Sequence, residues 1–490
     1  MLPTQLVARF EPSWSDETLL SRADAVIAAN ANRVALIDDE RALTFEELDD
    51  RARRLAGHLR ARGVEPGDVI SWQLPNWWEA AAVHLAAMRL GAVSNPVNPA
   101  FRDRELEHVT RTAGTRALIT PAVWRGFDHA TLTATAQIVL RARGGELDRL
   151  FAAPSQEAPV HDARPHETAV LLFTSGTTGE PKGVPHTHRA LLYQTGTFAG
   201  AHALTPEDRY LGGPPVAHIA GLSYGILAPF ALGTSTVLLD RWDRPRASRA
   251  GEHRPTFMTG PPTFLLTLAE HARDLESFRL FSTGGATIPA AAIRAAGAAL
   301  GCSVKRAYGS TEIPFLTATA MDDTEHARLE TDGRALGANE IRIAEGGEIQ
   351  ARGPGMFEGY VDEPLTDEWF ATGDLGTIDE DGYLHVVGRL KDIIIRGGEN
   401  ISAKELEDLL HEHPSVADVA IVGMTDERLG ERVCAVVVPR ESFTFDDMIV
   451  FLTARAIAKH KLPERLELRD SLPRTDSGKI RKDALRTELG

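Results

Sequence analysis

The chain has 490 residues, more than one compact hydrophobic core usually holds, so at least two domains are expected. Hydrophobic residues make up 43% of it and charged residues 25%, which is typical of soluble globular proteins. A formal charge of −16 argues against nucleic acid or an anionic membrane surface as the main partner. No apolar run reaches the roughly 18 residues of a membrane-spanning helix.

Cysteine usage indicates a reducing compartment. Cys302 and Cys434 are far apart, and neither lies in a CxxC or Cys/His pattern, so neither a structural zinc site nor a disulfide framework is expected. The first ten residues lack the basic start and apolar stretch of a secretory signal. These features predict a cytoplasmic protein.

Helix and strand signals alternate through the first third of the chain. Thr44 with Glu47 three positions later predicts a capping box that opens a helix running to about Arg62. After turn signals at Gly63 and Pro66, the predicted elements are a strand over 69–74, a helix over 78–90 and a strand over 92–94. This alternation predicts βαβ units around largely parallel sheets, an α/β fold.

Two later changes in pattern suggest the domain organisation. Residues 144–167 are polar and contain proline, which predicts a loop before a buried strand over 168–173. Beyond Gly388 and Arg389 the predicted elements are a helix over 403–413, strands over 416–422 and 432–438, and a helix over 445–460. We therefore expect a large domain over 1–388 and a small α+β domain over 389–490.

A glycine-rich turn follows the strand that ends at Phe173. It contains three glycines, four hydroxyl side chains and Lys182, between Thr174 and Gly183. Glycine backbone amides and hydroxyls can surround phosphate oxygens, and a lysine adds positive charge. The Walker pattern does not fit, because Pro181 stands at its second glycine position and Gly183 at its Ser/Thr position. The turn therefore predicts a triphosphate-binding loop of another kind.

This turn resembles the signature of the AMP-forming adenylating enzymes, which include acyl-CoA synthetases, adenylation domains of peptide synthetases and beetle luciferases. Further motifs occur in the family's order, so the resemblance covers nearly the whole chain. It implies a large N-terminal domain of βαβ-type subdomains and a small mobile C-terminal domain. It also implies that ATP with Mg²⁺ converts a carboxylic acid to an acyl-adenylate, releasing pyrophosphate, and that coenzyme A then displaces AMP to form a thioester.

The resemblance assigns the nucleotide site residue by residue. Tyr308 would offer a flat face to adenine, Thr311 a hydroxyl near the phosphates, and Glu312 a catalytic carboxylate that binds the metal. Asp374 and Arg389 would hold the ribose. The remaining nucleotide contacts implied are Thr174, Ser175, Gly176, Thr177, Gly179, Gly284, Gly285, Ala286, Gly309 and Ser310, with Thr178 and Lys182 as catalytic residues of the loop.

The segment from Pro473 to Lys479 resembles the family's last signature, whose lysine reaches the carboxylate and the α-phosphate. A fixed cation where charge develops lowers the barrier, and loss of one such group costs about 10²–10³ in rate. In the second step the thiol attacks the carbonyl carbon of the acyl-adenylate, which is the carboxyl carbon that Lys479 approached in the first step. The thiol needs open access to this carbon, so the domain that carries Lys479 must turn away. Lys391 occupies the family's hinge position.

After this rotation Gly397, Gly398 and Glu399 would line the channel for the pantetheine arm of coenzyme A. The family usually has proline where this chain has Ala403, a departure that removes no functional group.

His218 resembles the family's gate residue beside an acyl pocket that Ala307 and Gly309 would also line. Adenylation domains for amino acids usually place an aspartate in this region, but none stands between Leu211 and Phe230. An amino acid is therefore disfavoured, because a buried ammonium group without a partner is costly. The stretch over 72–79 resembles ligases of medium-chain or alicyclic acids, and an aromatic acid stays open.

Three other functions stay open at this stage. The enzyme could load a carrier-protein phosphopantetheine instead of free coenzyme A, and thiol dependence would distinguish the two. A luciferase-type oxidation is disfavoured, because nothing in the sequence points to an oxygen-reactive substrate. A non-catalytic nucleotide-binding module is disfavoured by the joint presence of Lys182, Glu312, Asp374, Arg389 and Lys479. The possible partners are thus the acid, ATP and coenzyme A, and a homodimer is also open.

Overall fold

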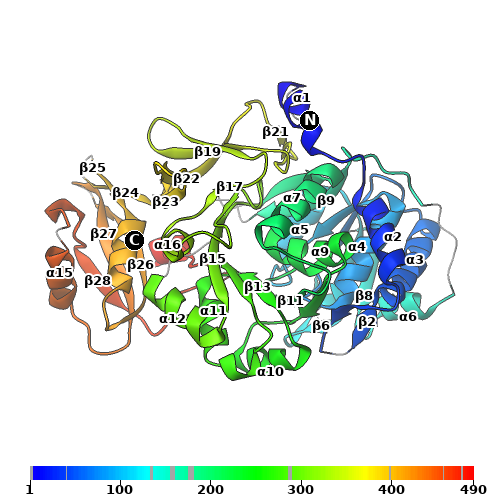
Figure 1. Ribbon diagram of the computed structural model, residues 1–490, viewed down its shortest axis with the longest axis horizontal. Helices are drawn as coiled ribbons and strands as arrows, with labels where there is room; N and C mark the ends of the chain where they lie inside the picture. The colour runs from blue at the N-terminus through cyan, green and yellow to red at the C-terminus, as the bar shows by residue number, and fades with distance from the viewer. Residues whose placement is uncertain are drawn as a thin grey trace.

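The chain folds into two large sheets with flanking helices, followed by smaller sheets toward the C-terminus (Figure 1). This computed structural model describes residues 4–39, 41–132, 136–154, 160–174, 181–284, 290–396, 399–426, 428–455, 457–475 and 478–489. The predicted α/β class is confirmed. In the part of the chain that the structure describes, no helix has both the length and the apolar character needed to cross a membrane.

A six-stranded sheet forms the first large layer, in the order β10-β9-β4-β3-β5-β8. Its strands are β3 (Val69–Trp72), β4 (Val93–Pro96), β5 (Thr115–Pro121), β8 (Ile138–Ala142), β9 (Thr168–Thr174) and β10 (Lys182–Thr187). Its neighbours pair in parallel except for β9 and β10, which form an antiparallel hairpin. The helices that precede, separate and follow these strands along the chain are α3 (Phe45–Ala61), α4 (Trp78–Leu90), α5 (Asp103–Ala113), α6 (Glu146–Ala152) and α7 (His188–Ala201).

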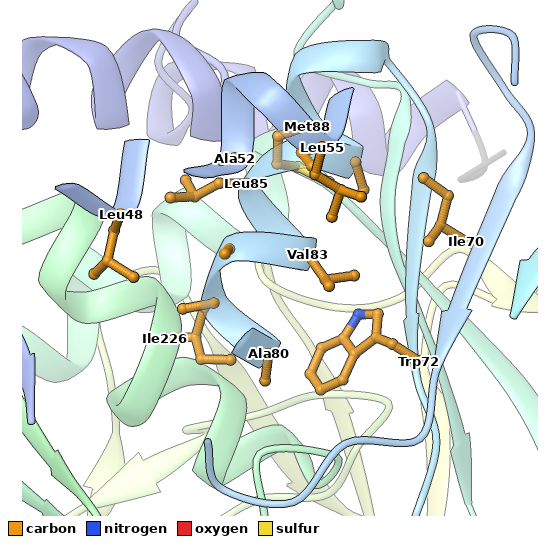
Figure 2. Packing of buried hydrophobic residues seen from close by; sticks show 14 of the residues in the cluster. Leu48, Ala52, Leu55, Ile70, Trp72, Ala80, Val83, Leu85, Met88 and Ile226 are labelled. Atoms are coloured by element: carbon orange, nitrogen blue, oxygen red, sulfur yellow. The ribbon is translucent and has the colours of Figure 1, made fainter. Parts of the chain in front are cut away.

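Helix α4 is buried along its whole length, which explains its run of alanines. Figure 2 shows its side chains packed between α3 and β3, with Leu55 on one side and Ile70 and Trp72 on the other. Small side chains let neighbouring elements approach closely while the larger ones fill the space that is left. The helix ends at Gly91, whose backbone has φ 67°, a left-handed conformation that suits glycine.

A nine-stranded sheet forms the second large layer, in the order β17-β16-β15-β14-β13-β11-β12-β1-β2. Its strands are β1 (Val34–Ile37), β2 (Ala42–Thr44), β11 (Arg209–Gly212), β12 (Ser235–Leu238), β13 (Phe257–Gly260), β14 (Leu280–Thr283), β15 (Ser303–Tyr308), β16 (Thr317–Ala318) and β17 (Arg334–Ala335). Its parallel centre runs from β1 through β15, so the carboxyl ends of β14 and β15 lie side by side. The other helices of this region are α1 (Thr4–Phe10), α2 (Leu19–Asn30), α8 (Ile219–Leu222), α9 (Ala228–Leu232), α10 (Arg244–Arg249), α11 (Pro262–Ala269), α12 (Ala290–Leu300) and α13 (Glu325–Glu330), with a π-helical turn over Ser223–Leu227.

An antiparallel sheet in the order β18-β19-β22-β23 connects the large sheets to the C-terminal part. Its strands are β18 (Glu340–Ile343), β19 (Glu348–Arg352), β22 (Phe370–Ile378) and β23 (Leu384–Arg389). Two small hairpins are β6 (Val123–Trp124) with β7 (Phe127–Asp128), and β20 (Gly359–Tyr360) with β21 (Glu363–Pro364). Short 3₁₀ turns occupy Glu11–Ser13, His129–Thr131, Ala250–His253, Ala272–Asp274, Leu390–Asp392 and Lys459–Lys461.

The C-terminal part has a sheet and a core of its own. Its strands are β24 (Ile393–Arg396), β25 (Glu399–Ser402), β26 (Val416–Asp426), β27 (Gly430–Pro439) and β28 (Arg465–Leu468), and its helices are α14 (Ala403–His411), α15 (Phe445–Ala454) and α16 (Lys482–Leu489). Buried residues from β24, α14, β26, β27 and α15 form one apolar cluster. Figure 1 places this part at the opposite end of the long axis from α3 and α6.

The capping box at the start of α3 is confirmed. The Thr44 hydroxyl accepts the N–H of Glu47, and the Glu47 carboxylate accepts the N–H of Thr44. The predicted loop over 144–167 is wrong over α6, where Asp148 accepts the N–H groups of the preceding glycines and Leu147 is buried. The predicted helix over 445–460 is too long, because the chain turns after Ala454 and brings Leu462 onto the core beside α15.

Candidate active site

The β9–β10 hairpin positions the predicted phosphate loop. Thr174 ends β9 and pairs with Lys182, which begins β10, so the two ends of the loop are fixed beside each other. The Lys182 ammonium lies 3.2 Å from a carboxylate oxygen of Glu363 and 4.6 Å from the centre of the Tyr360 ring. The predicted loop residues Ser175, Gly176, Thr177, Thr178 and Gly179 lie outside the described residues.

Glu312 is held next to this lysine by Tyr360. The Tyr360 hydroxyl donates a hydrogen bond of 2.9 Å to Glu312 Oε1. His186 of β10 donates from Nε2 to the Thr311 carbonyl oxygen at 2.8 Å, and burial lowers the pKa of His186 to about 4, which keeps the ring neutral. The cation of Lys182 and the carboxylate of Glu312 therefore approach one tyrosine from two different elements.

Two residues predicted for the adenine and ribose, Tyr308 and Arg389, converge on a third, Asp374. Its carboxylate accepts hydrogen bonds from the Tyr308 hydroxyl at 2.8 Å and from Arg389 Nε at 2.7 Å. Arg389 is the direct partner of Asp374 across the β22–β23 ladder, whereas Tyr308 comes from the end of β15 in the nine-stranded sheet. Asp374 is only 4% exposed, and burial raises the pKa of Tyr308, so its hydroxyl stays protonated as a donor.

The loop that carries Lys479 packs against the large sheet region. Gly478 has φ 83°, and a Cβ atom there would lie 3.2 Å from Cγ of Pro261, next to α11. The Lys479 side chain is exposed to solvent at its surface, although the protein around it partly desolvates the ammonium group. This desolvation, followed by the nearby charge of Arg389, lowers its pKa, while Asp374 and Glu312 act in the opposite direction. The C-terminal lysine thus lies within electrostatic range of both carboxylates of the site.

His218 also lies within electrostatic range of Lys479. It caps α8, where its Nδ1 accepts the N–H of Ala220 at 3.4 Å. Burial, together with the charge of Lys479, lowers the pKa of His218 to about 4, so its imidazole is neutral at physiological pH. Leu222 and Ile226, in the helices that follow, are buried apolar residues.

The predicted glycines lie where the ends of β14 and β15 approach. A Cβ atom on Gly284 would stand 2.4 Å from the carbonyl oxygen of Ala307, and one on Gly309 would stand 2.8 Å from the N atom of Phe315. Neither position has room for a side chain. The Ser310 hydroxyl accepts the N–H of Ile313, which closes the turn after β15. Gly285 and Ala286 lie outside the described residues.

Of the residues predicted for the coenzyme A channel, the structure describes Glu399, which lies in the C-terminal sheet. Lys391 lies in the 3₁₀ turn Leu390–Asp392, and Glu399 is an exposed partner of Arg396 in the β24–β25 hairpin. Gly397 and Gly398 lie outside the described residues. Arg389 contacts Asp374 directly and Lys479 lies within electrostatic range of it, whereas no contact of Glu399 with Asp374 is found among the described residues.

Sequence reasoning missed Tyr360, which joins Lys182 to Glu312. Its only local signal is an aromatic hydroxyl after Gly359, and its partner Glu312 is 48 positions away in the chain. Among the residues that the structure describes, no group of three or more His, Cys, Asp or Glu side chains is arranged to hold a metal. A metal that binds mainly through phosphate oxygens and water needs only one or two carboxylates.

Comparisons with known proteins decide the family. The sequence profile described as AMP-binding enzyme matches residues 23–361, and the profile described as AMP-binding enzyme C-terminal domain matches residues 405–479. The chain belongs to the AMP-binding enzymes. A medium-chain fatty-acid–CoA ligase of Escherichia coli K12 is 35% identical, over 97% of this chain and 91% of that protein.

Two further relatives agree. A CoA ligase of Mycobacterium tuberculosis H37Rv, named for a propanoyl group on a methyl-dioxo-octahydroindene ring system, is 34% identical over 96% of this chain and 99% of its own length. The crystal structure of ATP-bound MatB from Rhodopseudomonas palustris superposes with a TM-score of 0.87 at 29% identity, covering 97% and 99% of the two chains. The predicted family, fold class and enzyme class are confirmed.

This AMP-binding enzyme is an AMP-forming acid–thiol ligase. It uses ATP to convert a carboxylic acid to an acyl-adenylate and transfers the acyl group to coenzyme A. The small molecules that it binds are thus the acid, ATP and coenzyme A.

Proposed function

We propose that Lys479 is the cation that brings the carboxylate of the acid to the α-phosphate of ATP. The observation that carries this proposal is that the Lys479 loop packs against Pro261, which brings Lys479 within electrostatic range of Glu312, Asp374 and His218. Both reacting groups are anions and repel each other, so a preorganised ammonium group between them stabilises the transition state more than the separated reactants.

The remaining contacts suit a nucleotide. Asp374 has accepting capacity beyond its bonds to Tyr308 and Arg389 and can receive the ribose hydroxyls. Lys182 and the loop from Thr174 to Thr178 would hold the outer phosphates. Glu312 keeps one carboxylate oxygen free of the Tyr360 hydroxyl, which fits a Mg²⁺ ion shared with phosphate oxygens. The ion would neutralise the phosphate charge.

For the second step we propose rotation of a domain over 389–490 against the domain over 1–388, with Lys391 as the hinge. The motion would withdraw Lys479 from the adenylate and bring Gly397, Gly398 and Glu399 to the entrance of the pantetheine channel. Supporting this, Glu399 lies outside the Lys479 cluster in the present arrangement, so one orientation does not serve both steps.

The acid is proposed to be apolar, of the medium-chain, alicyclic or aromatic type. No acidic residue stands between Leu211 and Phe230, and His218 is neutral, so this wall offers no partner to an ammonium group. The ligases similar to this chain are named for a medium-chain fatty acid and for a fused-ring propanoyl acid. We also propose a cytoplasmic reaction, consistent with the free thiols of Cys302 and Cys434.

The test separates the two half-reactions. A panel of carboxylic acids is screened for acid-dependent exchange of labelled pyrophosphate into ATP, first with wild type and then with Lys479→Ala. We expect exchange to fall by about 10²–10³ in the variant, while thioester formation from preformed adenylate and coenzyme A survives. Equal loss of both half-reactions would contradict the role of Lys479 and the rotation. Acyl transfer to a phosphopantetheine carrier protein in preference to coenzyme A would overturn the choice of acceptor.

A further inference from the structure

A cavity of about 710 Å³ lies where α3, α6 and the start of α4 meet, and none of its lining residues belongs to the cluster around Lys479. Figure 1 shows α3 and α6 at the end of the long axis opposite the C-terminal sheet. The cavity walls include Arg41, Arg51, Trp78, Arg143 and Phe151. It opens beyond the carboxyl end of β8, the edge of a parallel sheet at which α/β proteins often bind ligands.

The acidic side chains of this cavity already have partners. Asp50 pairs with Arg54, and Glu79 pairs with Arg143 at 3.0 Å. Asp148 accepts the N–H of Gly144 at 2.6 Å and that of Arg143 at 3.0 Å. These carboxylates therefore balance charges within the wall and leave no acidic cluster for a cation.

Two arginines of the cavity are not balanced in this way. The guanidinium carbons of Arg41 and Arg51 lie 5.5 Å and 5.4 Å from the centre of the Trp78 ring. Arg51 also donates to the carbonyl oxygen of Glu47, but within the described ranges neither arginine has a carboxylate partner. Guanidinium groups on an aromatic face retain free N–H donors for a carboxylate or phosphate.

Trp78 adds a third donor and an apolar surface. It is only 5% exposed, and its indole Nε1–H has no acceptor in the part of the chain that the structure describes. Its ring lies 4.9 Å from that of Phe151, so two aromatic side chains form the wall beside the arginines. A buried donor without an acceptor is unfavourable, and an oxygen of a bound anion would satisfy it.

We propose that this cavity is a second binding site, for an organic anion that joins a carboxylate or phosphate to a planar or apolar body. Arg41, Arg51 and the Trp78 N–H bind the anionic oxygens, and the rings of Trp78 and Phe151 contact the body. The reaction of this enzyme supplies two molecules of this chemistry, the carboxylic acid and AMP. The cavity has the volume of a small-molecule site.

Equilibrium dialysis tests the site with labelled AMP and labelled octanoate as separate probes and inorganic phosphate as a third. The variant is Arg41→Ala/Arg51→Ala, and Trp78→Phe removes only the indole N–H. Arg60→Ala is the matched control, because Arg60 is exposed on α3 outside the cavity. Thermal unfolding checks that each variant is folded.

We expect wild type and Arg60→Ala to bind one equivalent of AMP or of octanoate in addition to the one at the active site. The double variant should bind this additional equivalent at least about tenfold more weakly, a free-energy difference of about one charge-assisted hydrogen bond. Trp78→Phe should weaken the same equivalent. Hydrogen exchange over 143–152 should slow on binding in wild type only. AMP alone or octanoate alone identifies the source of the anion. Equal binding of both probes by wild type and the double variant, or binding of inorganic phosphate as tight as that of AMP, would overturn the proposal.

Discussion

The guanidinium of Arg474 donates a hydrogen bond of 2.5 Å to the carbonyl oxygen of Gly478, the residue before Lys479. The same group forms an ion pair with Asp418 on β26. Within the turn, the N–H of Lys479 donates to Thr475 Oγ1 at 3.1 Å. Arg474 therefore ties the backbone that carries Lys479 to the central sheet of the C-terminal part.

Arg474→Ala is expected to loosen this turn and displace the Lys479 ammonium. Misplacement of a catalytic group by about 1 Å can cost 10²-fold, so pyrophosphate exchange should fall by about 10–100-fold. Thioester formation from preformed adenylate should change little, because Lys479 is not needed there. Arg465→Ala removes an exposed ion pair with Glu467 in the same part of the chain and is the control. An equal loss in both half-reactions would show general damage to the domain instead.

The pH dependence of adenylation should report the charge of Lys479. Its folded pKa is lowered from the usual 10.5, so the active cation is present at low pH and is lost as the pH rises through the shifted value. We expect kcat/KM for pyrophosphate exchange to fall on an alkaline limb that begins below pH 10.5. In Lys479→Arg this limb should move to higher pH, since arginine stays protonated. An unchanged limb in that variant would assign the titration to another group.

Tyr360→Phe should weaken the hold on Glu312 and thereby the proposed Mg²⁺ site. The variant removes the hydroxyl that donates to Glu312 Oε1 at 2.9 Å but keeps the ring beside Lys182. Hydrogen bonds to charged groups contribute about 1.5–3 kcal/mol, so the Mg²⁺ concentration for half-maximal exchange should rise about tenfold. Tyr383→Phe is the matched control, because its hydroxyl donates to Asp323 at 2.7 Å away from this site. A similar shift in both variants would contradict the specific role.

Sequence signals predict helices correctly where the backbone N–H and C=O groups at the helix ends are hydrogen-bonded by residues nearby in the chain. Thr44 and Glu47 complete a capping box within one turn of helix, and the alanine-rich segment of α4 ends at the left-handed Gly91, so both helices were predicted with nearly correct bounds. Helix α6 was missed because its start is fixed by Asp148 and its apolar face is short, while the sequence around it is polar.

The residues of the candidate site could be predicted only where the chain resembles the motifs of the AMP-forming adenylating enzymes. Tyr308 and Arg389 are 81 positions apart, and nothing in their local sequence requires both to contact Asp374; the register of β22 with β23 and the end of β15 bring them together. Tyr360 acts through long-range contacts with Lys182 and Glu312, and Arg474 through one with Asp418, and these contacts leave no periodic pattern. Such contacts are set by tertiary packing, which a single sequence does not display.

Leu55→Ala tests the core that supports α4. Leu55 of α3 is fully buried where this helix packs against α4, and Figure 2 shows it beside Met88. Removing its isobutyl group leaves a cavity that neighbouring helices fill only in part, so the free energy of unfolding should fall by about 2–5 kcal/mol. Val450→Ala, at a residue that is 68% exposed, should change it by less than about 0.5 kcal/mol. Urea titrations followed by circular dichroism measure both. Pyrophosphate exchange per folded molecule should stay at the wild-type level, because Leu55 belongs to a core cluster that contains none of the candidate site residues. A loss of stability below about 1 kcal/mol would mean that the core collapses around the smaller side chain.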